Sequence, residues 1–379
     1  MKLYLLILTT LLASLNAGCS NEKGSLNNKG ISLSKAMGDA GGENFMKAET
    51  ARRFTFPDDH GPHPDFRTEW WYFTGNLTSA DGREFGYQFT IFRTSLTKDK
   101  PLRASDWNSN QIYMAHFAVT DISGGRFFFD ERFSREGNRL AGASAKPFRV
   151  WLEDWEITET GGEGAFGLPQ IRIKAANENC GIDFTLNAAK NYVLQGDSGL
   201  SRKGAAVGNA SYYYSYTDLA TEGNISVSGK SFAVSGNSWM DREWSTSALS
   251  NDQTGWDWFA LQLDGGTELM FYQMRKTDGT SDEYSKGIVV FSDGTSNVIS
   301  RNDVALEVTD FWKNSSGVSY PSGWMLRIPS LDAALKITPA VKDQMLDVSV
   351  KYWEGAVRVQ GLLRGGETKG KGYVELTGY

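Results

Sequence analysis

The chain has 379 residues, of which 40% are hydrophobic and 22% charged, so it can build two or three domains with buried cores. A formal net charge of -6 and the lack of a basic stripe argue against nucleic acid as a partner. Aromatic residues at 13% and 41 Gly against 9 Pro favour many strands joined by tight turns, and 2 Cys exclude a disulfide framework.

The beginning of the chain, residues 1–18, has the pattern of a signal peptide. A short positive start precedes an apolar run at residues 3–15, which is too short to span a membrane as a helix. Small residues directly before Cys19 resemble a bacterial lipobox, which predicts lipidation of that cysteine. Cleavage after Ala17 is the alternative, because Asn16 stands where a lipobox usually has an aliphatic residue.

Both alternatives predict an exported protein on the periplasmic side of a bacterial membrane. Lipidation would in addition anchor the protein at Cys19, with the outer membrane as one destination. Residues 19–50 are rich in Ser, Asn, Gly and Lys, and this composition predicts a flexible tether. If Cys19 is lipidated, Cys180 is left alone and is expected to be a buried or inert thiol.

Strand patterns dominate the chain from about Phe54 onward, and long amphipathic helices are not evident. The segment 84–95 alternates apolar and polar residues, with Phe85, Tyr87, Phe89 and Ile91 on one face. Further strands are predicted at residues 111–121, 224–227, 231–235, 256–263, 268–275, 287–291 and 351–360, separated by Gly-containing turns. Many short strands at close spacing predict an all-β fold of the sandwich or barrel type.

Two segments of the sequence repeat a loose pattern. Residues 71–89 and residues 258–274 each contain an aromatic strand, an Asp-Gly turn, a Glu and a second aromatic strand. The repeat suggests that two related hairpins each open a β domain. We therefore predict one domain at residues 51–248 and a second at residues 249–379.

The segment Ser238–Thr246 combines two tryptophans, two carboxylates and an arginine. In an extended strand, Trp239, Asp241 and Glu243 would project from one face, with Met240, Arg242 and Trp244 on the other. A carboxylate against an aromatic wall has a raised pKa, so Asp241 or Glu243 could be a general acid in an apolar pocket. The alternative is that Arg242 or another arginine neutralises both acids and the segment closes a barrel end.

Other segments add residues that could have either a functional role in a pocket or a structural role in the fold. Glu69–Phe73 could line a hydrophobic pocket, with Glu69 at its mouth, or could close a barrel by stacking a tryptophan over an arginine. His116 lies in an apolar strand, where a hydrogen-bonded core role competes with a proton relay to Asp241 or Glu69. The tyrosines near Tyr213 could orient a ligand or form an amphipathic strand. Asp58–Asp65 could hold zinc, but its Gly and Pro residues favour a solvated entry loop.

Together these residues resemble the AttH-like proteins, which are related to the bacterial carotenoid 1,2-hydratases. The resemblance runs from about Phe54 to the C-terminus and rests on residues 69–75, 211–219, 238–246, 255–258 and 372–379. It implies two lipocalin-like (calycin) antiparallel β-barrels side by side and a hydrophobic ligand. The hydratases add water to an isoprenoid double bond by protonating it, and Asp241 is the nearest match to their acid. Many AttH-like members are named only as predicted secreted hydrolases.

Three functions follow from these observations. The first is an exported lipocalin-like carrier or sensor that binds a lipid or isoprenoid in an aromatic-lined barrel pocket. The second is an enzyme, a hydro-lyase or hydrolase, in which Asp241 is the acid. The third is an accessory protein of an ABC-type exporter.

For the enzyme, the predicted catalytic residues are Asp241, Glu243, Glu69 and His116. The predicted ligand-binding residues are Trp70, Trp71, Tyr72, Tyr213, Trp239 and Arg242. No cofactor and no metal site are expected. The expected partners are a hydrophobic small molecule and, through Cys19, a membrane.

Overall fold

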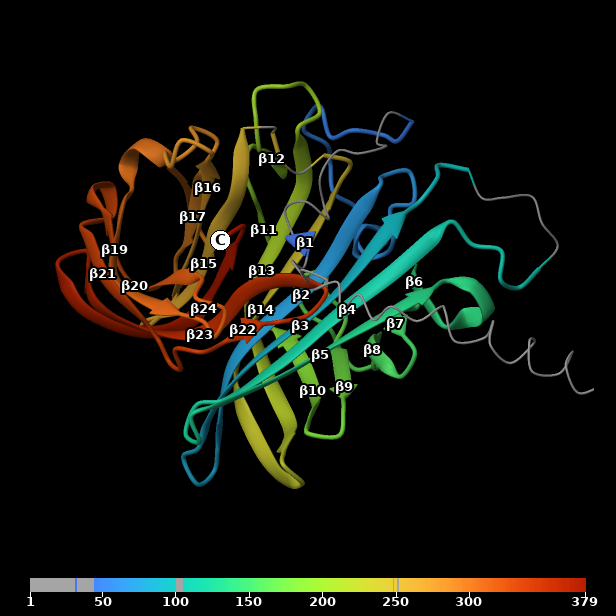
Figure 1. The fold of residues 1–379 in the computed structure, drawn as a ribbon, viewed down its shortest axis with the longest axis horizontal. Coiled ribbons are helices and arrows are strands. Elements are labelled where there is room, and N and C mark those ends of the chain that lie inside the picture. Colours follow the sequence, from blue (N-terminus) through green and yellow to red (C-terminus); the bar gives the residue numbers. More distant parts are fainter. Residues whose placement is uncertain (1–30, 33–43, 100–104, 248, 251) are drawn as a thin grey trace, which may run out of the picture. The chain divides into compact units, whose positions relative to one another are not determined.

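Two β-sheets that lie side by side make up most of the chain (Figure 1). The structure is a computed structural model, and it describes residues 31–32, 44–99, 105–247, 249–250 and 252–379. The predicted signal peptide and residues 19–30, with Cys19, and 33–43 of the predicted tether lie outside the described residues. In the described part, no helix is both long and apolar enough to cross a membrane.

The first sheet has 13 strands in the order β5-β4-β3-β2-β14-β13-β10-β9-β8-β7-β6, and β11 and β12 pair with β13. Strands β4 and β5 contact β6 and β7 at the other end of the order, so the sheet forms a nearly closed barrel. Its strands are β2 (Thr68–Ser79), β3 (Glu84–Ser95), β4 (Gln111–Asp121), β5 (Arg126–Arg135), β6 (Ala141–Ala145), β7 (Phe148–Leu152), β8 (Trp155–Glu159), β9 (Ile171–Ala176), β10 (Cys180–Ala188), β11 (Val193–Leu194), β12 (Leu200–Arg202), β13 (Ala210–Val227) and β14 (Lys230–Ser245).

The second sheet has 11 strands in the order β18-β17-β16-β15-β24-β23-β21-β20-β19, and β1 and β22 pair with β23. It forms a half-barrel beside the first sheet. Its strands are β1 (Ile31–Ser32), β15 (Gln253–Leu263), β16 (Thr267–Lys276), β17 (Lys286–Val290), β18 (Ser296–Ser300), β19 (Ala305–Lys313), β20 (Ser319–Ile328), β21 (Ala333–Pro339), β22 (Met345–Leu346), β23 (Val350–Leu363) and β24 (Gly366–Thr377). The helical elements of the described residues are short 3₁₀ turns at Asp58–His60, Gly137–Arg139, Arg301–Asp303 and Pro329–Leu331.

The interiors of both sheets are filled by apolar side chains. In β3, alternate residues from Phe85 to Ile91 are fully buried in the first interior, as the alternation predicted. Phe259, Trp324 and Trp353 belong to the separate core of the second sheet. Because large aromatic side chains occupy these interiors, the expectation of a ligand pocket inside a barrel is corrected below.

A third apolar cluster lies between the two sheets and joins their outer faces. It includes Tyr72, Tyr213 and Trp239 from the first sheet and Trp258 and Tyr272 from the second. Polar contacts cross the same interface, among them Asn76 Nδ2 to the Gly372 carbonyl at 3.2 Å and Lys190 Nζ to Glu268 at 2.8 Å. The two sheets therefore pack through a mixed apolar and polar interface.

The predicted hairpins and strands agree with the observed sheets. Segments 84–95 and 111–121 coincide with β3 and β4, and the repeated pattern corresponds to the hairpins β2–β3 and β15–β16. The two strands of each hairpin are neighbours in the strand order of their sheet. The division into domains at residues 51–248 and 249–379 stays a prediction.

The segment Asp58–Asp65 differs from the expected solvated loop. Asp59 and His60 are buried, and His60 Nδ1 lies 2.7 Å from the Tyr214 hydroxyl oxygen. His63 stacks on Trp244, with ring centroids 3.8 Å apart. Gly61 is buried as well, whereas Asp58, Pro64 and Asp65 are exposed, so the segment is a partly buried loop. Among the described residues, no group of three or more His, Cys, Asp or Glu side chains is arranged to hold a metal ion.

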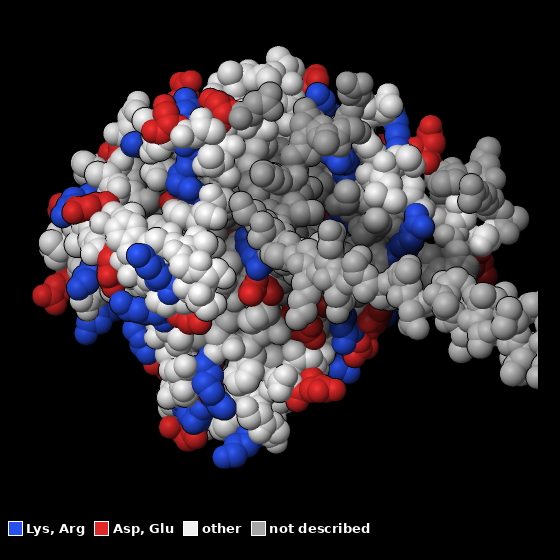
Figure 2. Space-filling view, in the orientation of Figure 1, with Lys and Arg blue, Asp and Glu red and all other residues white. Residues whose placement is uncertain are grey.

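Charge is mixed over the molecular surface shown in Figure 2. Lysine and arginine side chains lie close to aspartate and glutamate side chains across this face, in keeping with the net charge of -6. Where the described residues are visible there, positive side chains do not form one continuous area.

Candidate active site between the two sheets

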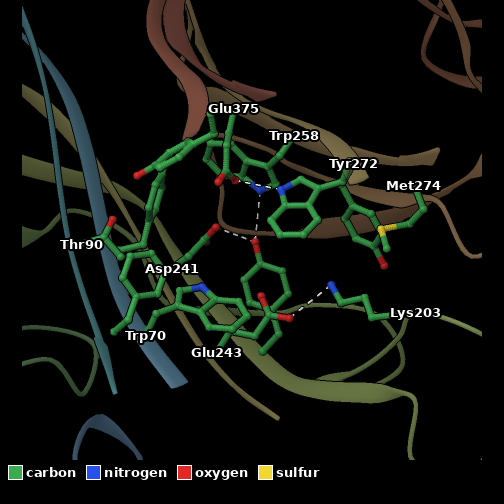
Figure 3. Close-up of a pocket in the computed structure, with 14 residues that line it drawn as sticks. Trp70, Thr90, Lys203, Asp241, Glu243, Trp258, Tyr272, Met274 and Glu375 are labelled. Atoms are coloured by element: carbon green, nitrogen blue, oxygen red, sulfur yellow. Dashed lines mark hydrogen bonds and ion pairs between the residues drawn. The ribbon is translucent and has the colours of Figure 1, made fainter. Parts of the chain in front are cut away.

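A cavity lies between the two sheets, and strands of both supply its walls (Figure 3). The space that atoms do not fill there is about 710 Å³, with the open solvent at its mouth included. The lining residues are Trp70, Tyr72, Thr90, Phe92, Lys203, Tyr213, Asp241, Glu243, Trp256, Trp258, Tyr272, Met274, Tyr352 and Glu375. The predicted pocket inside a barrel is thus replaced by a pocket between the two sheets.

Strand alternation explains which side chains reach this cavity. In β14, Asp241 and Glu243 line the cavity, whereas Met240 and Trp244 belong to the core of the first sheet. The same alternation in β13 directs Tyr213 to the cavity, and its neighbours on either side to the core. The arrangement agrees with the two faces expected for the segment Ser238–Thr246.

Asp241 is a buried carboxyl whose hydrogen-bond donors are neutral. Its Oδ1 accepts hydrogen bonds from Trp239 Nε1 at 2.7 Å and from the Ser215 hydroxyl at 2.5 Å. Its Oδ2 accepts one from the Tyr213 hydroxyl at 2.5 Å. Burial raises the pKa of Asp241 to about 7, although these donors favour the charged form, and the charge of Glu243 raises it further. Asp241 can therefore hold or release a proton near neutral pH.

Glu243 has a cationic partner, unlike Asp241. Lys203 Nζ lies 3.2 Å from Glu243 Oε1, and the Ser211 hydroxyl donates to the same oxygen. Lys203 Nζ also lies 4.3 Å from the centre of the Tyr272 ring (Figure 3). Burial lowers the pKa of Lys203, but the charge of Glu243 and the Tyr272 hydroxyl outweigh it and the pKa is raised. Lys203 and Glu243 thus form a charged pair at one wall of the cavity.

Two further acids come from the second sheet: Glu354 is fully buried and Glu375 is partly buried. Glu354 and Glu375 lie directly opposite each other on β23 and β24. The Tyr72 hydroxyl donates to Glu354 at 2.9 Å, and Trp256 Nε1 donates to Glu375 at 2.9 Å. Burial raises the pKa of Glu375 to about 7, and burial together with the charge of Glu375 raises the pKa of Glu354 well above its usual value.

These two glutamates were absent from the sequence-based candidates. Each is one acid inside an apolar strand, at Tyr352–Ala356 and at Tyr373–Leu376. This is the signal that selected Asp241, and it could have selected them as well.

Three predicted site residues lie on the opposite face of the first sheet. Glu69 forms buried ion pairs with Arg93 and Arg242, and Trp71 lies beneath Arg242, 4.0 Å from its guanidinium carbon. Burial would raise the pKa of Glu69, but the two arginines hold it well below its usual value. The predicted positions of Glu69 at the pocket mouth, and of Trp71 and Arg242 at the ligand, are corrected, because the three face away from the cavity. The alternative of an arginine lock applies to Glu69 and not to Asp241.

The remaining predicted residues lie in and behind the cavity wall. Trp70, Tyr72 and Tyr213 line the cavity, and their ligand-binding role stays a prediction. Trp239 supports Asp241 and packs edge-on against Trp258, with centroids 6.2 Å apart. His116 contacts neither Asp241 nor Glu69 through a hydrogen bond. Its partners are Tyr352, at 2.7 Å, and Glu131, at 3.0 Å.

Comparisons with known proteins place this architecture in a family. A family model described as AttH-like matches residues 47–379. The dehydratase asqC of Emericella nidulans is 23% identical over 305 residues, which cover 71% of this chain and 85% of that protein. A solved structure of a Nitrosomonas europaea protein assigned to AttH is 31% identical, covers 88% of this chain and 100% of that chain, and has a TM-score of 0.77.

A second solved structure shares the fold at lower identity. Kievitone hydratase from Nectria haematococca is 16% identical, covers 89% of this chain and 97% of that chain, and has a TM-score of 0.66. The family-model match includes every strand of both sheets except β1, and every residue that lines the cavity. The chain therefore belongs to the AttH-like family.

Proposed function

We propose that this protein adds water to, or removes water from, a hydrophobic substrate held between the two sheets, with Asp241 as the general acid–base group. The observation that carries the proposal is a buried carboxyl with neutral donors, a pKa of about 7 and a wall of tryptophan and tyrosine rings. The similarity to a dehydratase over 71% of the chain supports this reaction class. Kievitone hydratase has the same fold and is named for the reverse reaction.

The geometry suggests which oxygen of Asp241 carries the proton. Oδ1 already accepts two hydrogen bonds, from Trp239 and Ser215, whereas Oδ2 meets only the Tyr213 hydroxyl among its described donors. A proton on Oδ2 can pass to the substrate directly or through the Tyr213 hydroxyl, which also accepts from Trp258 Nε1 at 3.3 Å. Protonation of a carbon–carbon double bond by Asp241 leaves a cation at the substrate, and in dehydration Asp241 takes the same carbon-bound proton back.

Aromatic faces in the cavity can stabilise that cation. Trp70, Tyr72 and Trp258 line the cavity, and aromatic rings attract cations at their faces. Asp241 is 4% exposed, so bulk water has little access to its carboxyl, which strengthens electrostatic interactions there. An extended apolar substrate such as an isoprenoid or a prenylated aromatic compound suits this lining.

A binding function without chemistry is the second candidate. The apolar part of the lining would bury a lipid or isoprenoid, and the charged pair of Lys203 and Glu243 would bind one polar group. Export, an anchor at Cys19 and an exporter partner are compatible with both the carrier and the enzyme. A carrier would retain its ligand when Asp241 is replaced by Asn, whereas the enzyme would lose its reaction.

The test uses the purified chain with geranylgeraniol and a prenylated phenol in water labelled with ¹⁸O. Mass spectrometry should detect a product that has gained one labelled water, and the Asp241→Asn variant should form it at least about 10²-fold more slowly. Asp257→Asn is the matched control, since Asp257 is also buried but lies outside the cavity lining. Product formation by D241N at the wild-type rate, or no product from either probe, would contradict the proposal.

A further inference from the structure

A row of polar residues crosses the first sheet beside the cavity. These residues are paired in register on neighbouring strands, so they share the face that looks toward the second sheet. The row runs from Ser215 on β13 through Asp241, Tyr72, Thr90 and His116 to Glu131 on β5. Asp241, Tyr72 and Thr90 of this row line the cavity, and the row ends at β5, the edge strand of the sheet. The proposed acid mechanism uses only the Asp241 end of this row.

Hydrogen bonds connect the other end of the row to the cavity through a residue of the second sheet. The hydroxyl oxygen of Tyr352, a lining residue, lies 2.7 Å from His116 Nδ1. His116 Nε2 lies 3.0 Å from Glu131 Oε1, which also accepts from the Ser349 hydroxyl at 2.5 Å. His116 and Tyr352 are buried, whereas the Glu131 side chain is 15% exposed. The chain of contacts therefore leads from the cavity to solvent.

The protonation states fix the direction of these hydrogen bonds. Burial lowers the pKa of His116, so its ring is neutral near pH 7. Burial raises the pKa of Glu131, but hydrogen bonds from His116 and Ser349 outweigh it and keep the pKa below its usual value. An ionised Glu131 carboxylate can only accept hydrogen bonds, so His116 Nε2 must donate to it and carries the ring hydrogen. His116 Nδ1 then has no hydrogen and accepts a hydrogen bond from the Tyr352 hydroxyl. The lone pairs of the Tyr352 oxygen are then free to accept a proton.

We propose that Tyr352, His116 and Glu131 form the basic half of the site, with Tyr352 as the catalytic base and the other two as a relay to the surface. This inference rests on the proposed function. During hydration, Asp241 gives its proton to the double bond and water bonds to the resulting cation. The bound water then passes a proton to the Tyr352 oxygen, while the Tyr352 proton moves to His116 Nδ1 and the Nε2 proton moves to Glu131.

The three transfers balance charge and can be reversed. After the product leaves, the same transfers in the opposite direction return the proton to the cavity, where Asp241 takes it up and every group regains its first state. Dehydration uses the same groups in reverse order: Glu131 begins protonated, and Asp241 finally receives the substrate's carbon-bound proton. No co-reactant other than water is needed.

The acids around Tyr352 explain why the relay must move protons together. The charges of Glu354 on the same strand, Glu375 on β24 and Glu131 on β5 all act on Tyr352. Burial and then the charges of these acids raise the pKa of Tyr352 well above its usual value, which disfavours a tyrosinate. Tyr352 therefore accepts one proton as it passes another to His116, and it is never an anion.

The first experiment measures the tautomer of His116, which does not depend on activity. ¹⁵N NMR of histidine-labelled protein, with 3 His in the chain, should show a neutral His116 with its hydrogen on Nε2 between pH 7 and pH 8. Tyr352→Phe should move the Nδ1 resonance, because the hydrogen bond to Nδ1 is lost. Tyr320→Phe, at another buried tyrosine of the second sheet, should leave it unchanged. A hydrogen on Nδ1 would overturn the relay.

The second experiment measures the pH dependence of turnover with the probe that the wild-type protein hydrates. Y352F should lower kcat by about 10²-fold, and Glu131→Gln should lower it by about tenfold. Neither variant should change KM much. In hydration, kcat of the wild type should fall at acid pH as Glu131 protonates and above about pH 7 as Asp241 ionises. E131Q should lose only the acid-side decrease.

The two proposals fail in different ways in this experiment. If D241N keeps the wild-type rate, the proposed function is wrong. If D241N is inactive while Y352F and E131Q keep the wild-type kcat and pH profile, the proposed function stands and the relay is wrong. Melting temperatures of the variants show whether a loss of kcat reflects a loss of folding.

Discussion

At the scale of single residues, two buried carboxyls of neighbouring strands have opposite protonation behaviour. Glu69 meets two arginines and has a pKa well below its usual value, whereas Asp241 meets three neutral donors and has a pKa of about 7. Burial acts in the same direction on both, so the partners decide the outcome. Glu69 is therefore a fixed charge, while Asp241 can exchange a proton.

The Tyr213 hydroxyl should tune the proton affinity of Asp241. Its hydrogen bond to Oδ2 favours the carboxylate, so Tyr213→Phe should raise the pKa of Asp241 above about 7. ¹³C NMR of labelled aspartate over a pH titration measures this shift, and Y320F is the control at a distant buried tyrosine. If the titration midpoint of Asp241 were lower in Y213F than in the wild type, the Tyr213 hydroxyl would not stabilise the charged form of Asp241.

At the scale of single elements, β14 carries two different polar groups on its two faces. Asp241 and Glu243 face the cavity, while Arg242 faces the first barrel, where it contacts Glu69 and the Gly61 carbonyl at 2.6 Å. The arginine side ties β2, β3 and the segment before β2 together through fixed charges. The acid side remains available for a ligand.

Loss of the fixed charge at Glu69 should destabilise the fold strongly. Glu69→Gln would leave Arg93 and Arg242 buried without their anion, and we expect a loss of about 3–5 kcal/mol in the free energy of unfolding. Denaturant unfolding at pH 8 measures it. D241N is the matched control and should not destabilise at this pH, because it removes a carboxylate whose burial disfavours its charge. If both variants lost the same free energy of unfolding, the assignment of the arginine lock to Glu69 and not to Asp241 would be wrong.

Strand β3 approaches the second sheet closely at Gly86. A Cβ there would lie 2.5 Å from the Tyr373 hydroxyl oxygen and 2.8 Å from Ala356 Cβ. Gly86→Ala should therefore destabilise the interface by about 1–3 kcal/mol, measured by denaturant unfolding. Tyr373→Phe in the same chain should recover part of the loss. Gly366→Ala is the control, as its nearest contact would lie at 3.7 Å, and a neutral G86A would show that the sheets can separate there.

At the scale of the whole molecule, the interface between the sheets concentrates acids whose pKa values are raised. Burial raises the pKa values of Asp241, Glu375 and Glu268 to about 7, and that of Glu354 well above its usual value. Asp241 lies on the first sheet and the three glutamates on the second. The packing of one sheet against the other is thus coupled to pH.

Stability should fall as the pH rises across this range. A group with a raised pKa in the folded state binds its proton more tightly there than in the unfolded chain, so its contribution is full below about pH 4 and is lost as pH rises through about 7. We expect a higher free energy of unfolding at pH 5 than at pH 8. Urea unfolding at both values tests this, and Glu375→Gln should reduce the difference. A higher stability at pH 8 than at pH 5 would contradict the assignment of protonated acids to the interface.

The sequence by itself determined the class of fold and the faces of its strands. Local alternation, as in residues 84–95, and Gly-containing turns depend only on near neighbours along the chain, so β3, β4 and both hairpins could be predicted. The same alternation separated Asp241 and Glu243 from Arg242. The AttH-like resemblance rested on motifs that now lie in both sheets.

Only the tertiary structure decided where the cavity lies and which groups meet in it. The sequence could not show that the barrel interiors are filled, that Glu69 meets Arg93 and Arg242, or that His116 meets Tyr352, 236 positions away. Each of these depends on which strands become neighbours and how two sheets pack. Alternation fixes the face of a strand on which a side chain lies, but the sheet that covers this face decides whether an acid there is paired with an arginine or kept protonated.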